Sequence, residues 1–218
     1  RIDSHRLTFN LIRMCGRFTQ TKSREDVLEQ LGEIELPPLF HGRYNVAPTQ
    51  KITVIRQAAP NHAEECVWGF KNPRSTSIVI NARSETLTQR PMFRDLTSTN
   101  RCLIPADGFY EWKGKQPYYF QIMDKKLFGF AGLWNEGRCV ILTKAADSNM
   151  QGIHDRMPII ITPNHWTEWL ADFQIPKVLP SLLVQPVSRR VNKVANDDPS
   201  CLDQGEVQTD LSLFPDEG

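Results

Sequence analysis

Residues 101–143, RCLIPADGFYEWKGKQPYYFQIMDKKLFGFAGLWNEGRCVILT, consist of short apolar segments separated by polar turns. β-branched and aromatic residues predict strands at Arg101–Ile104, Phe109–Trp112, Tyr118–Ile122, Leu127–Leu133 and Arg138–Thr143. The connections between them, such as 113–117 and 124–126, are too short to hold helical crossovers. The stretch therefore predicts a mostly antiparallel sheet that can curl toward a barrel.

Outside this run, the pattern predicts more strands and a few helices. Further strands are expected at Lys51–Gln57, Ser77–Asn81 and Met157–Ile161. Ser23–Gly32 predicts a helix, because Ser23 and Asp26 form a capping-box pattern ahead of an apolar face. A second helix is expected to open at Thr162-Pro163, with Thr162 as its cap. The predicted fold class is α+β, strand-rich, with a mostly antiparallel curled sheet or barrel-like core and a few flanking helices.

The chain of 218 residues is long enough for one well-buried core, and no Pro/Gly/Ser-rich linker divides it. We expect a single domain over residues 14–205. Residues 1–13 lack the features of a secretory signal and precede a Met followed by a small residue, so we interpret them as a non-native or removable leader. Residues 206–218 are rich in acidic residues and are predicted to be a flexible tail.

Composition limits the function classes. A hydrophobic fraction of 40% and a charged fraction of 23% are typical of a soluble globular protein, and no apolar run approaches the roughly 20 residues of a membrane helix. A net charge of +1 means that any nucleic-acid site must come from local clusters of Arg and Lys. The five cysteines are widely spaced and form no CxxC pair. We therefore expect no metal, no cofactor, no disulfide framework and a reducing, cytoplasmic location.

Cys15 is the strongest candidate nucleophile. At a mature N-terminus, its α-amine and thiol would sit on adjacent carbons and form a 1,2-aminothiol. The amine, with a pKa of about 8, can attack an aldehyde to give a Schiff base. The thiol can then add to the C=N bond and close a thiazolidine ring. The plainer interpretation, a buried structural thiol, fits most cysteines, but the position after Met14 and before Gly16 favours chemistry.

Three other residues complete a set suited to proton transfer. Glu111 lies inside an aromatic strand that can raise its pKa, His154 lies beside a charge pair, and Asn81 lies at a strand end. Singly, each fits a plainer role: a solvated carboxylate, a loop histidine or a turn former. With Cys15 they supply a nucleophile, a carboxylic acid, an imidazole and an amide donor.

Five motifs occur in order along the chain: Met14-Cys15-Gly16-Arg17-Phe18, Arg43-Tyr44-Asn45-Val46-Ala47-Pro48, Asn81-Ala82-Arg83-Ser84-Glu85, Pro105-Ala106-Asp107-Gly108-Phe109-Tyr110-Glu111-Trp112 and His154-Asp155-Arg156-Met157-Pro158. A later match at Pro186-Val187-Ser188 extends the similarity to about residue 196. Together they resemble the motifs of the SRAP family, the SOS response-associated peptidases. The chain departs from many relatives after Trp68-Gly69, where it continues as Phe70-Lys71-Asn72-Pro73-Arg74.

The resemblance implies a protein that binds single-stranded DNA and crosslinks to the aldehyde of an abasic site. Cys15 would be the nucleophile, Asn81 would bond near the sugar, Glu111 would shuttle protons and His154 would act on the sugar hydroxyl. The DNA contacts it implies are Arg17, Arg43, Asn45, Arg83 and Arg156, with Trp68, Met92 and Phe93 against bases. Core packing is an equal alternative for Trp68. The resemblance also implies an autopeptidase activity on the leader, a possible lyase side activity, and a monomer near the nucleoid.

Two other functions stay open on the sequence. In an N-terminal-nucleophile hydrolase or cysteine peptidase, the Cys15 thiol would attack a carbonyl with His154 as base. In a non-covalent reader of modified DNA, the same groove would bind without a covalent step.

Overall fold

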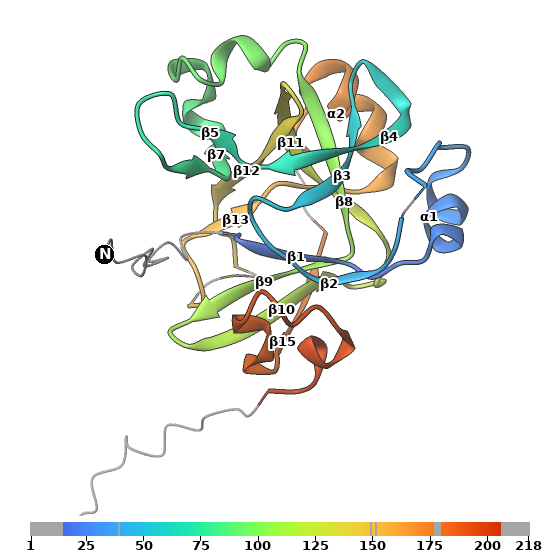
Figure 1. The fold of residues 1–218 in the computed structure, drawn as a ribbon, viewed down its shortest axis with the longest axis vertical. Helices are drawn as coiled ribbons and strands as arrows, with labels where there is room; N and C mark the ends of the chain where they lie inside the picture. Colours follow the sequence, from blue (N-terminus) through green and yellow to red (C-terminus); the bar gives the residue numbers. More distant parts are fainter. Residues whose placement is uncertain (1–14, 39, 149, 151, 177–179, 206–218) are drawn as a thin grey trace, which may run out of the picture.

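The strands of the protein form two large curled sheets and one small sheet, as the computed structural model in Figure 1 shows. It describes residues 15–38, 40–148, 150, 152–176 and 180–205. The expected leader at 1–13 and tail at 206–218 lie outside these residues. Among the described residues, no helix combines the length and the apolar character needed to cross a membrane.

Five strands of the larger sheet close into a barrel. Their pairing order is β12-β4-β3-β8-β11, and β11 pairs back with β12. The strands are β3 (Lys51–Arg56), β4 (Ala59–Trp68), β8 (Arg101–Ala106), β11 (Phe128–Asn135) and β12 (Arg138–Ala145), extended by β7 (Asn81–Arg83), β13 (Arg156–Pro158) and β14 (Ile160–Ile161). In the described part of the chain, β12 pairs parallel with β4 and β7, and the other strand pairings are antiparallel. The predicted strand-rich, mostly antiparallel and barrel-like α+β fold is confirmed.

The second sheet carries the strand that follows Cys15. Its order is β15-β10-β9-β1-β2, and Figure 1 shows it beneath the barrel. Its strands are β1 (Arg17–Gln20), β2 (Arg43–Val46), β9 (Gly108–Lys113), β10 (Gln116–Ile122) and β15 (Leu182–Pro186); the small sheet pairs β5 (Phe70–Lys71) with β6 (Ile78–Val79). Arg17 is paired with Tyr110 in the register of β1 and β9. This register brings the chain just before β1 to the Glu111 end of β9.

The alternation of β9 decides which of its side chains faces the barrel. Phe109 belongs to the core shared with the barrel, whereas Tyr110 packs with Val187 and Val191 on the opposite face. Because side chains alternate along a strand, Glu111 shares the face of Phe109 and points between the sheets. A larger residue at position 108 would collide with the Tyr119 side chain, since a Cβ there would lie 2.0 Å from Oη of Tyr119.

Asp107 fastens the far end of β1 to the corner between β8 and β9. Its buried carboxylate accepts hydrogen bonds from the hydroxyls of Thr19 and Thr21 and from the backbone N–H groups of Thr21 and Lys22. Charge-assisted bonds of this kind are stronger than neutral ones. The corner therefore fixes β1 against β9.

The helices lie at the edges of the molecule. α1 (Arg24–Leu31) begins at Ser23 with the predicted capping box to Asp26, which confirms that helix. The second helix differs from the prediction: a 3-10 turn, η3 (Pro163–His165), precedes α2 (Trp166–Asp172). The hydroxyl of Thr162 bonds to Nδ1 of His165, 3.0 Å away, instead of capping a helical N–H. The other 3-10 helices are η1 (Ser84–Gln89), η2 (Arg94–Leu96), η4 (Arg189–Asn192) and η5 (Pro199–Leu202).

Several strands were not predicted. Residues 43–46, for which no strand was predicted, form β2, because Phe18 and Gln20 of β1 offer this segment a pairing partner. β1 and β15 are also new, since each pairs with a strand far away in the sequence, and β4, which forms an antiparallel hairpin with β3, was not predicted either. The predicted strands of 77–81 and 157–161 are each split into two short strands.

Candidate active site

Cys15 and Glu111 form the centre of the site. The backbone nitrogen of Cys15 donates a hydrogen bond to Oε1 of Glu111, and the two residues are 3% and 1% exposed. Cys15 adopts a φ of 39°, a left-handed conformation that side chains other than Gly rarely take. Such strained residues gather at functional sites, where the surrounding structure holds them.

Burial and proximity change the pKa values of both groups. Burial, then the charge and hydrogen bond of Glu111, raise the pKa of the Cys15 thiol well above its ordinary value, and the charge of Arg156 opposes this. Burial also raises the pKa of Glu111, while the hydrogen bond from Cys15 and the charge of His154 lower it. A carboxyl group with a raised pKa holds a proton more readily than an ordinary carboxyl group, which suits a general acid and base.

His154 lies on the loop between β12 and β13, within electrostatic range of Glu111. Its Nδ1 accepts a hydrogen bond from the backbone N–H of Arg156 at 3.1 Å, and Oδ1 of Asp155 lies 3.0 Å from the same nitrogen. One nitrogen cannot serve both at once: the neutral ring accepts from Arg156 and carries its proton on Nε2, whereas a protonated ring can donate to Asp155. Nε2 of the neutral ring is therefore a donor, and His154 is one of the residues that line a pocket of about 400 Å³ formed around 152–155.

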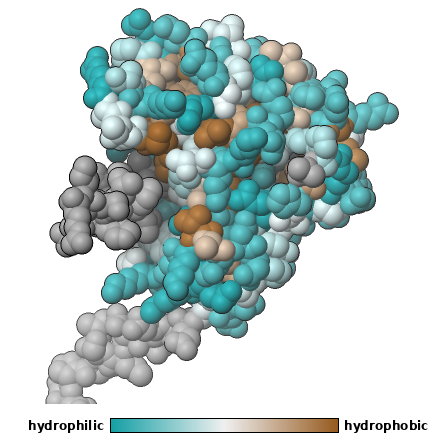
Figure 2. Space-filling model, in the orientation of Figure 1, coloured by the Kyte–Doolittle hydropathy of each residue, from teal (hydrophilic) through white to brown (hydrophobic). Residues whose placement is uncertain are grey.

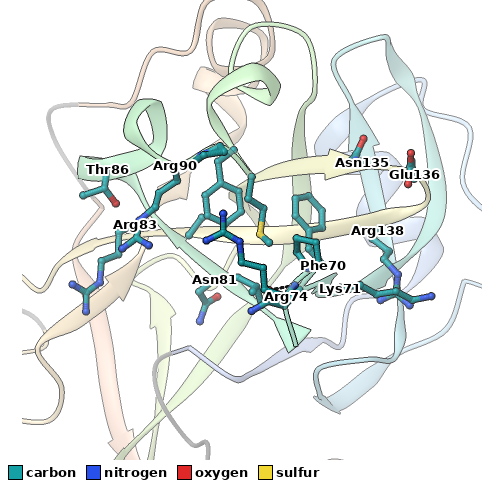
Figure 3. A pocket seen from close by; sticks show the side chains of 17 residues that line it. Phe70, Lys71, Arg74, Asn81, Arg83, Thr86, Arg90, Asn135, Glu136 and Arg138 are labelled. Carbon is teal, nitrogen blue, oxygen red and sulfur yellow. Dashed lines mark hydrogen bonds between the residues drawn. The ribbon is translucent and has the colours of Figure 1, made fainter. Parts of the chain in front are cut away.

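Asn81 lies at the start of β7, which pairs with β12, the strand that precedes the His154 loop. It lines a groove of about 890 Å³, drawn in Figure 3. The groove has five cationic residues and one acidic residue, namely Lys71, Arg74, Arg83, Arg90, Arg138 and Glu136. Phe70, Met92 and Phe93 also line it, with Phe70 and Phe93 largely buried. The structure thus places Asn81, Arg83, Met92 and Phe93 along one positively charged groove, and their roles stay predictions.

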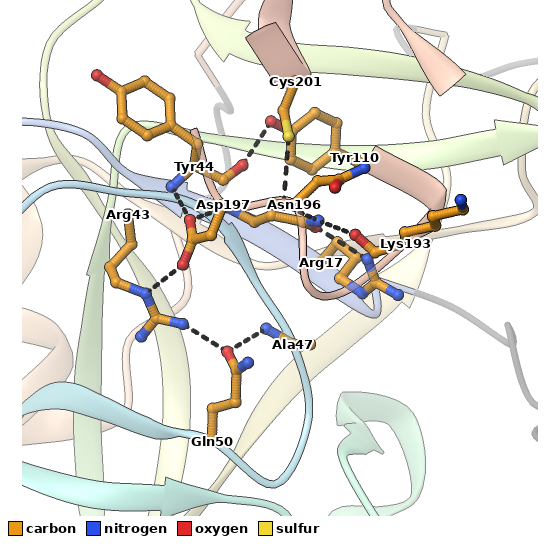
Figure 4. A network of polar contacts seen from close by, with 11 residues as sticks. Arg17, Arg43, Tyr44, Ala47, Gln50, Tyr110, Lys193, Asn196, Asp197 and Cys201 are labelled. Carbon is orange, nitrogen blue, oxygen red and sulfur yellow. Dashed lines mark hydrogen bonds and ion pairs between the residues drawn. The ribbon is translucent and has the colours of Figure 1, made fainter. Parts of the chain in front are cut away.

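Three of the expected DNA contacts, Arg17, Arg43 and Asn45, form hydrogen bonds or ion pairs within the chain itself. Figure 4 shows Arg17 and Arg43 in this network. Nη1 of Arg17 donates to Oδ1 of Asn45 at 2.9 Å and to the carbonyl of Val191 at 2.8 Å. Asn45 is fully buried, and its amide donates to carbonyl oxygens of residues 191, 193 and 196. Arg43 pairs with Asp197 at 2.7 Å, and that carboxylate also accepts from the backbone of residues 44 and 45. We call these contacts of Arg17, Arg43 and Asn45 with residues 191–197 the C-terminal clasp. The clasp holds β1 and β2 in place.

Trp68 corrects an expectation. It is 0% exposed, its indole N–H donates to the carbonyl of Ile80 at 3.0 Å, and its ring packs edge-on against Phe18 at 5.2 Å. Stacking on a base needs an accessible ring face, which Trp68 lacks. Its place is in the core, where it joins β1 to the residue before Asn81.

Arg156 is also largely buried, with its guanidinium bonded to both carboxylate oxygens of Glu85 at 2.7 and 2.9 Å. Sequence reasoning missed the part of Glu85, as well as Lys71, Arg74, Arg90 and Arg138 in the groove. The density of Arg and Lys between residues 71 and 94 was the signal available for the groove. The Glu85 pair gave no such signal, because its partner lies 71 residues away.

The surface around the site is mixed. Figure 2 shows apolar residues as small patches on a face that is otherwise hydrophilic. A few large apolar residues are exposed, such as Met123 and Val184, which is normal for protein surfaces.

Known proteins share both sequence and fold with this chain. Residues 14–196 match the profile of the family described as SOS response associated peptidase (SRAP). The abasic site processing protein YoqW of Bacillus subtilis is 38% identical over 223 residues, covering 87% of this chain and 99% of the relative. The abasic site processing protein YedK of Escherichia coli is 35% identical over 182 residues, covering 72% and 79%.

A solved structure of a protein from Bacteroides thetaiotaomicron superposes with a TM-score of 0.74 at 20% identity, covering 88% of this chain and all of that one, which indicates a common fold. A phage-related protein from Bordetella bronchiseptica superposes with a TM-score of 0.63 at 28% identity, covering 79% and 94%. Because the family profile matches residues 14–196, a range that includes Cys15, Glu111 and His154, the chain belongs to the SRAP family.

Proposed function

We propose that the protein senses abasic sites in single-stranded DNA and shields them through a covalent thiazolidine link to Cys15, once the residues before Cys15 have been removed. The observation that carries the proposal is the pairing of the Cys15 nitrogen and thiol with one buried carboxyl group, Glu111. Relatives covered over most of their length are named abasic site processing proteins, which supports the substrate.

The chemistry requires proton transfers that Glu111 can make. The free amine of Cys15 attacks the aldehyde carbon of the ring-opened deoxyribose, and loss of water leaves a C=N bond. The thiol sulfur then bonds to that carbon while its proton passes to the nitrogen, which closes the five-membered ring. Because the pKa of the thiol is raised, the thiol keeps its proton at neutral pH and needs a neighbouring acceptor. Glu111, hydrogen-bonded to Cys15 and itself raised in pKa, fits both transfers.

His154 and Asn81 complete the proposed site. The Nε2–H of neutral His154 can bond to the sugar hydroxyl, which assists closure or reversal of the ring. Asn81, on the groove side, can hold the ring-opened sugar by its amide. Both roles follow from the family motifs; the charge of His154 acts on Glu111, and Asn81 lines the groove.

The groove of Figure 3 supports single-stranded DNA as the partner. Positive side chains that track a backbone, beside apolar side chains for the bases, are typical of single-strand binding sites. Of the predicted DNA contacts that line this groove, Arg83 is exposed and Met92 is half-exposed, whereas Phe93 is buried. Each phosphate contact should contribute about 0.7 to the slope of log K against log salt. Changing Arg74 and Arg90 to Gln should therefore lower this slope by about 1.4.

Mass spectrometry of the adduct tests the covalent step. Protein that begins at Cys15 is mixed with an oligonucleotide carrying one abasic site, and the mass should rise by that of the strand less one water. Cys15→Ala should abolish the adduct, and Cys15→Ser should retain reversible binding without a thiazolidine. An adduct that survives denaturation in Cys15→Ala would refute the role of Cys15.

We further propose that the protein removes its own leader, which would justify the peptidase label of its family, and that β-elimination from the Schiff base gives a minor lyase activity. N-terminal sequencing of wild-type and Glu111→Gln protein from cells tests the first, and strand cleavage on gels tests the second.

We propose a monomer near the nucleoid, which sedimentation and fluorescence microscopy can test. A free-standing cysteine hydrolase is less favoured, because a buried thiol with a raised pKa provides little thiolate.

A further inference from the structure

A bidentate ion pair between Glu85 and Arg156 lies next to the Cys15 cluster, and the chemistry proposed above does not use it. Nη1 and Nη2 of Arg156 lie 2.7 and 2.9 Å from the two carboxylate oxygens of Glu85. Nη2 also donates to the carbonyl oxygen of Thr143 at 2.8 Å. The Arg156 side chain is 10% exposed, so its charge is poorly screened by water.

The carboxylate of Glu85 accepts hydrogen bonds from both ends of the loop that carries His154. Its Oε1 accepts from the backbone N–H of Ala145, the last residue of β12, at 3.2 Å. The same oxygen accepts from Arg156, the first residue of β13. Arg156 in turn donates its backbone N–H to Nδ1 of His154 at 3.1 Å. One carboxylate therefore fixes the two strand ends that flank the His154 loop. One of these ends, Arg156, also orients the imidazole through its backbone N–H.

The pair also controls charge at the nucleophile. The charged groups that act on the Cys15 thiol are Glu111, which raises its pKa, and Arg156, which lowers it. Those that act on Glu111 besides Cys15 are His154 and Asp155. Arg156 is held beside Cys15 by Glu85, and the negative charge of Glu85 offsets part of the positive field of Arg156.

We propose that Glu85 is a positioning residue: it clamps both ends of the His154 loop and holds the Arg156 guanidinium beside Cys15, and so sets the rate and the pH dependence of adduct formation. This role rests on the proposed function. It is separate from any contact of Glu85 with DNA, since both carboxylate oxygens are occupied within the protein.

The test compares three variants of protein that begins at Cys15. Glu85→Gln removes the charge and keeps the shape, and Glu85→Asp keeps the charge on a shorter side chain. Glu64→Gln is the matched control, because Glu64 forms a comparable pair with Arg56 at 2.7 and 3.0 Å, and neither residue is among the groups that act on Cys15 or Glu111. The readouts are the adduct rate at saturating abasic oligonucleotide from pH 5 to 10, the Kd for a tetrahydrofuran-containing strand, and the melting temperature.

Glu85→Gln should slow adduct formation about 10-fold at saturating DNA, the usual effect of losing a supporting hydrogen bond behind a reactive group. Its Kd for the tetrahydrofuran strand should change less than about threefold, within ordinary variation for a group that does not touch the ligand. The limb of the pH profile that reports thiol ionisation should move to lower pH, because Arg156 then acts unopposed. Glu85→Asp should leave that limb in place, and Glu64→Gln should match the wild type in rate and profile.

The inference is overturned if Glu85→Gln, folded at the assay temperature, keeps the wild-type rate and pH profile, or slows only as far as its unfolded fraction predicts. A second readout needs no adduct: the ring-proton NMR resonance of His154 in the free protein should shift in Glu85→Gln and stay unchanged in Glu64→Gln. If the wild type forms no adduct, the proposed function fails, and the His154 resonance still decides whether Glu85 positions the loop.

Discussion

Replacing Trp68 with Phe tests whether the Trp68 ring serves as a core residue or stacks on a DNA base. Trp68 is fully buried, and its indole N–H donates to the Ile80 carbonyl at 3.0 Å. If the ring is core, the change should destabilise the protein and leave DNA affinity alone. If the ring stacks on a base, stability should barely change and affinity should fall.

The size of the effect follows from three losses. The smaller ring leaves a void of roughly 40 Å³, which at about 24 cal/mol per Å³ costs about 1 kcal/mol. The lost apolar contact area costs about 1 kcal/mol more. The lost hydrogen bond adds about 1 kcal/mol, and not more, because the Ile80 carbonyl still accepts from the backbone of Ile141 at 3.1 Å. The sum, about 3 kcal/mol, should lower the melting temperature by about 6–12 °C in a chain of this length.

The matched control is Trp169→Phe. Trp169 is also 0% exposed and donates its N–H to a backbone carbonyl, that of Cys102, at 2.9 Å, but it lies on α2. Calorimetry should show similar destabilisation in both variants, and fluorescence anisotropy should show the wild-type Kd for single-stranded DNA in both, below their melting temperatures. A Kd that rises tenfold in Trp68→Phe alone, with little loss of stability, would refute the reasoning.

Three further predictions concern ionisable side chains that are buried or partly buried. Glu111→Gln should abolish adduct formation yet stabilise the fold. The pKa of Glu111 is raised in the folded protein, so its ionisation lowers the free energy of unfolding as pH rises from about 4.5 through the folded pKa. Urea titrations should therefore show a more stable variant at neutral pH and no difference below about pH 4. Asp197→Asn should weaken the ion pair with Arg43 and lower the melting temperature by several degrees, mostly at neutral pH. The pKa of Asp197 is depressed in the folded protein, so the stability that its carboxylate contributes is lost only in acid. An unchanged thermal scan at neutral pH would contradict this. Arg101→Met should cost about 3–5 kcal/mol in chemical denaturation, since the buried guanidinium of Arg101 donates to backbone carbonyls of residues 97, 98, 170 and 171. A loss below about 1 kcal/mol would mean that water replaces it.

Sequence alone determined the features that depend on near neighbours. The capping box of Ser23 and Asp26 and the strands of residues 101–143 follow from local spacing and side-chain type. The chemistry of Cys15 and Glu111 could also be anticipated, because a 1,2-aminothiol and a carboxylate within an aromatic strand have properties that residue type and local surroundings set.

Only the tertiary structure decided which distant residues meet. Cys15 and Glu111 are 96 residues apart, and Arg43 and Asp197 are 154 apart, so β-sheet register and burial had to bring each pair together. The same burial turned Trp68 into a core residue and Arg17 and Asn45 into parts of the clasp. A residue type states what a side chain can do, whereas its exposure and partners depend on non-local strand pairing, which a local pattern does not specify.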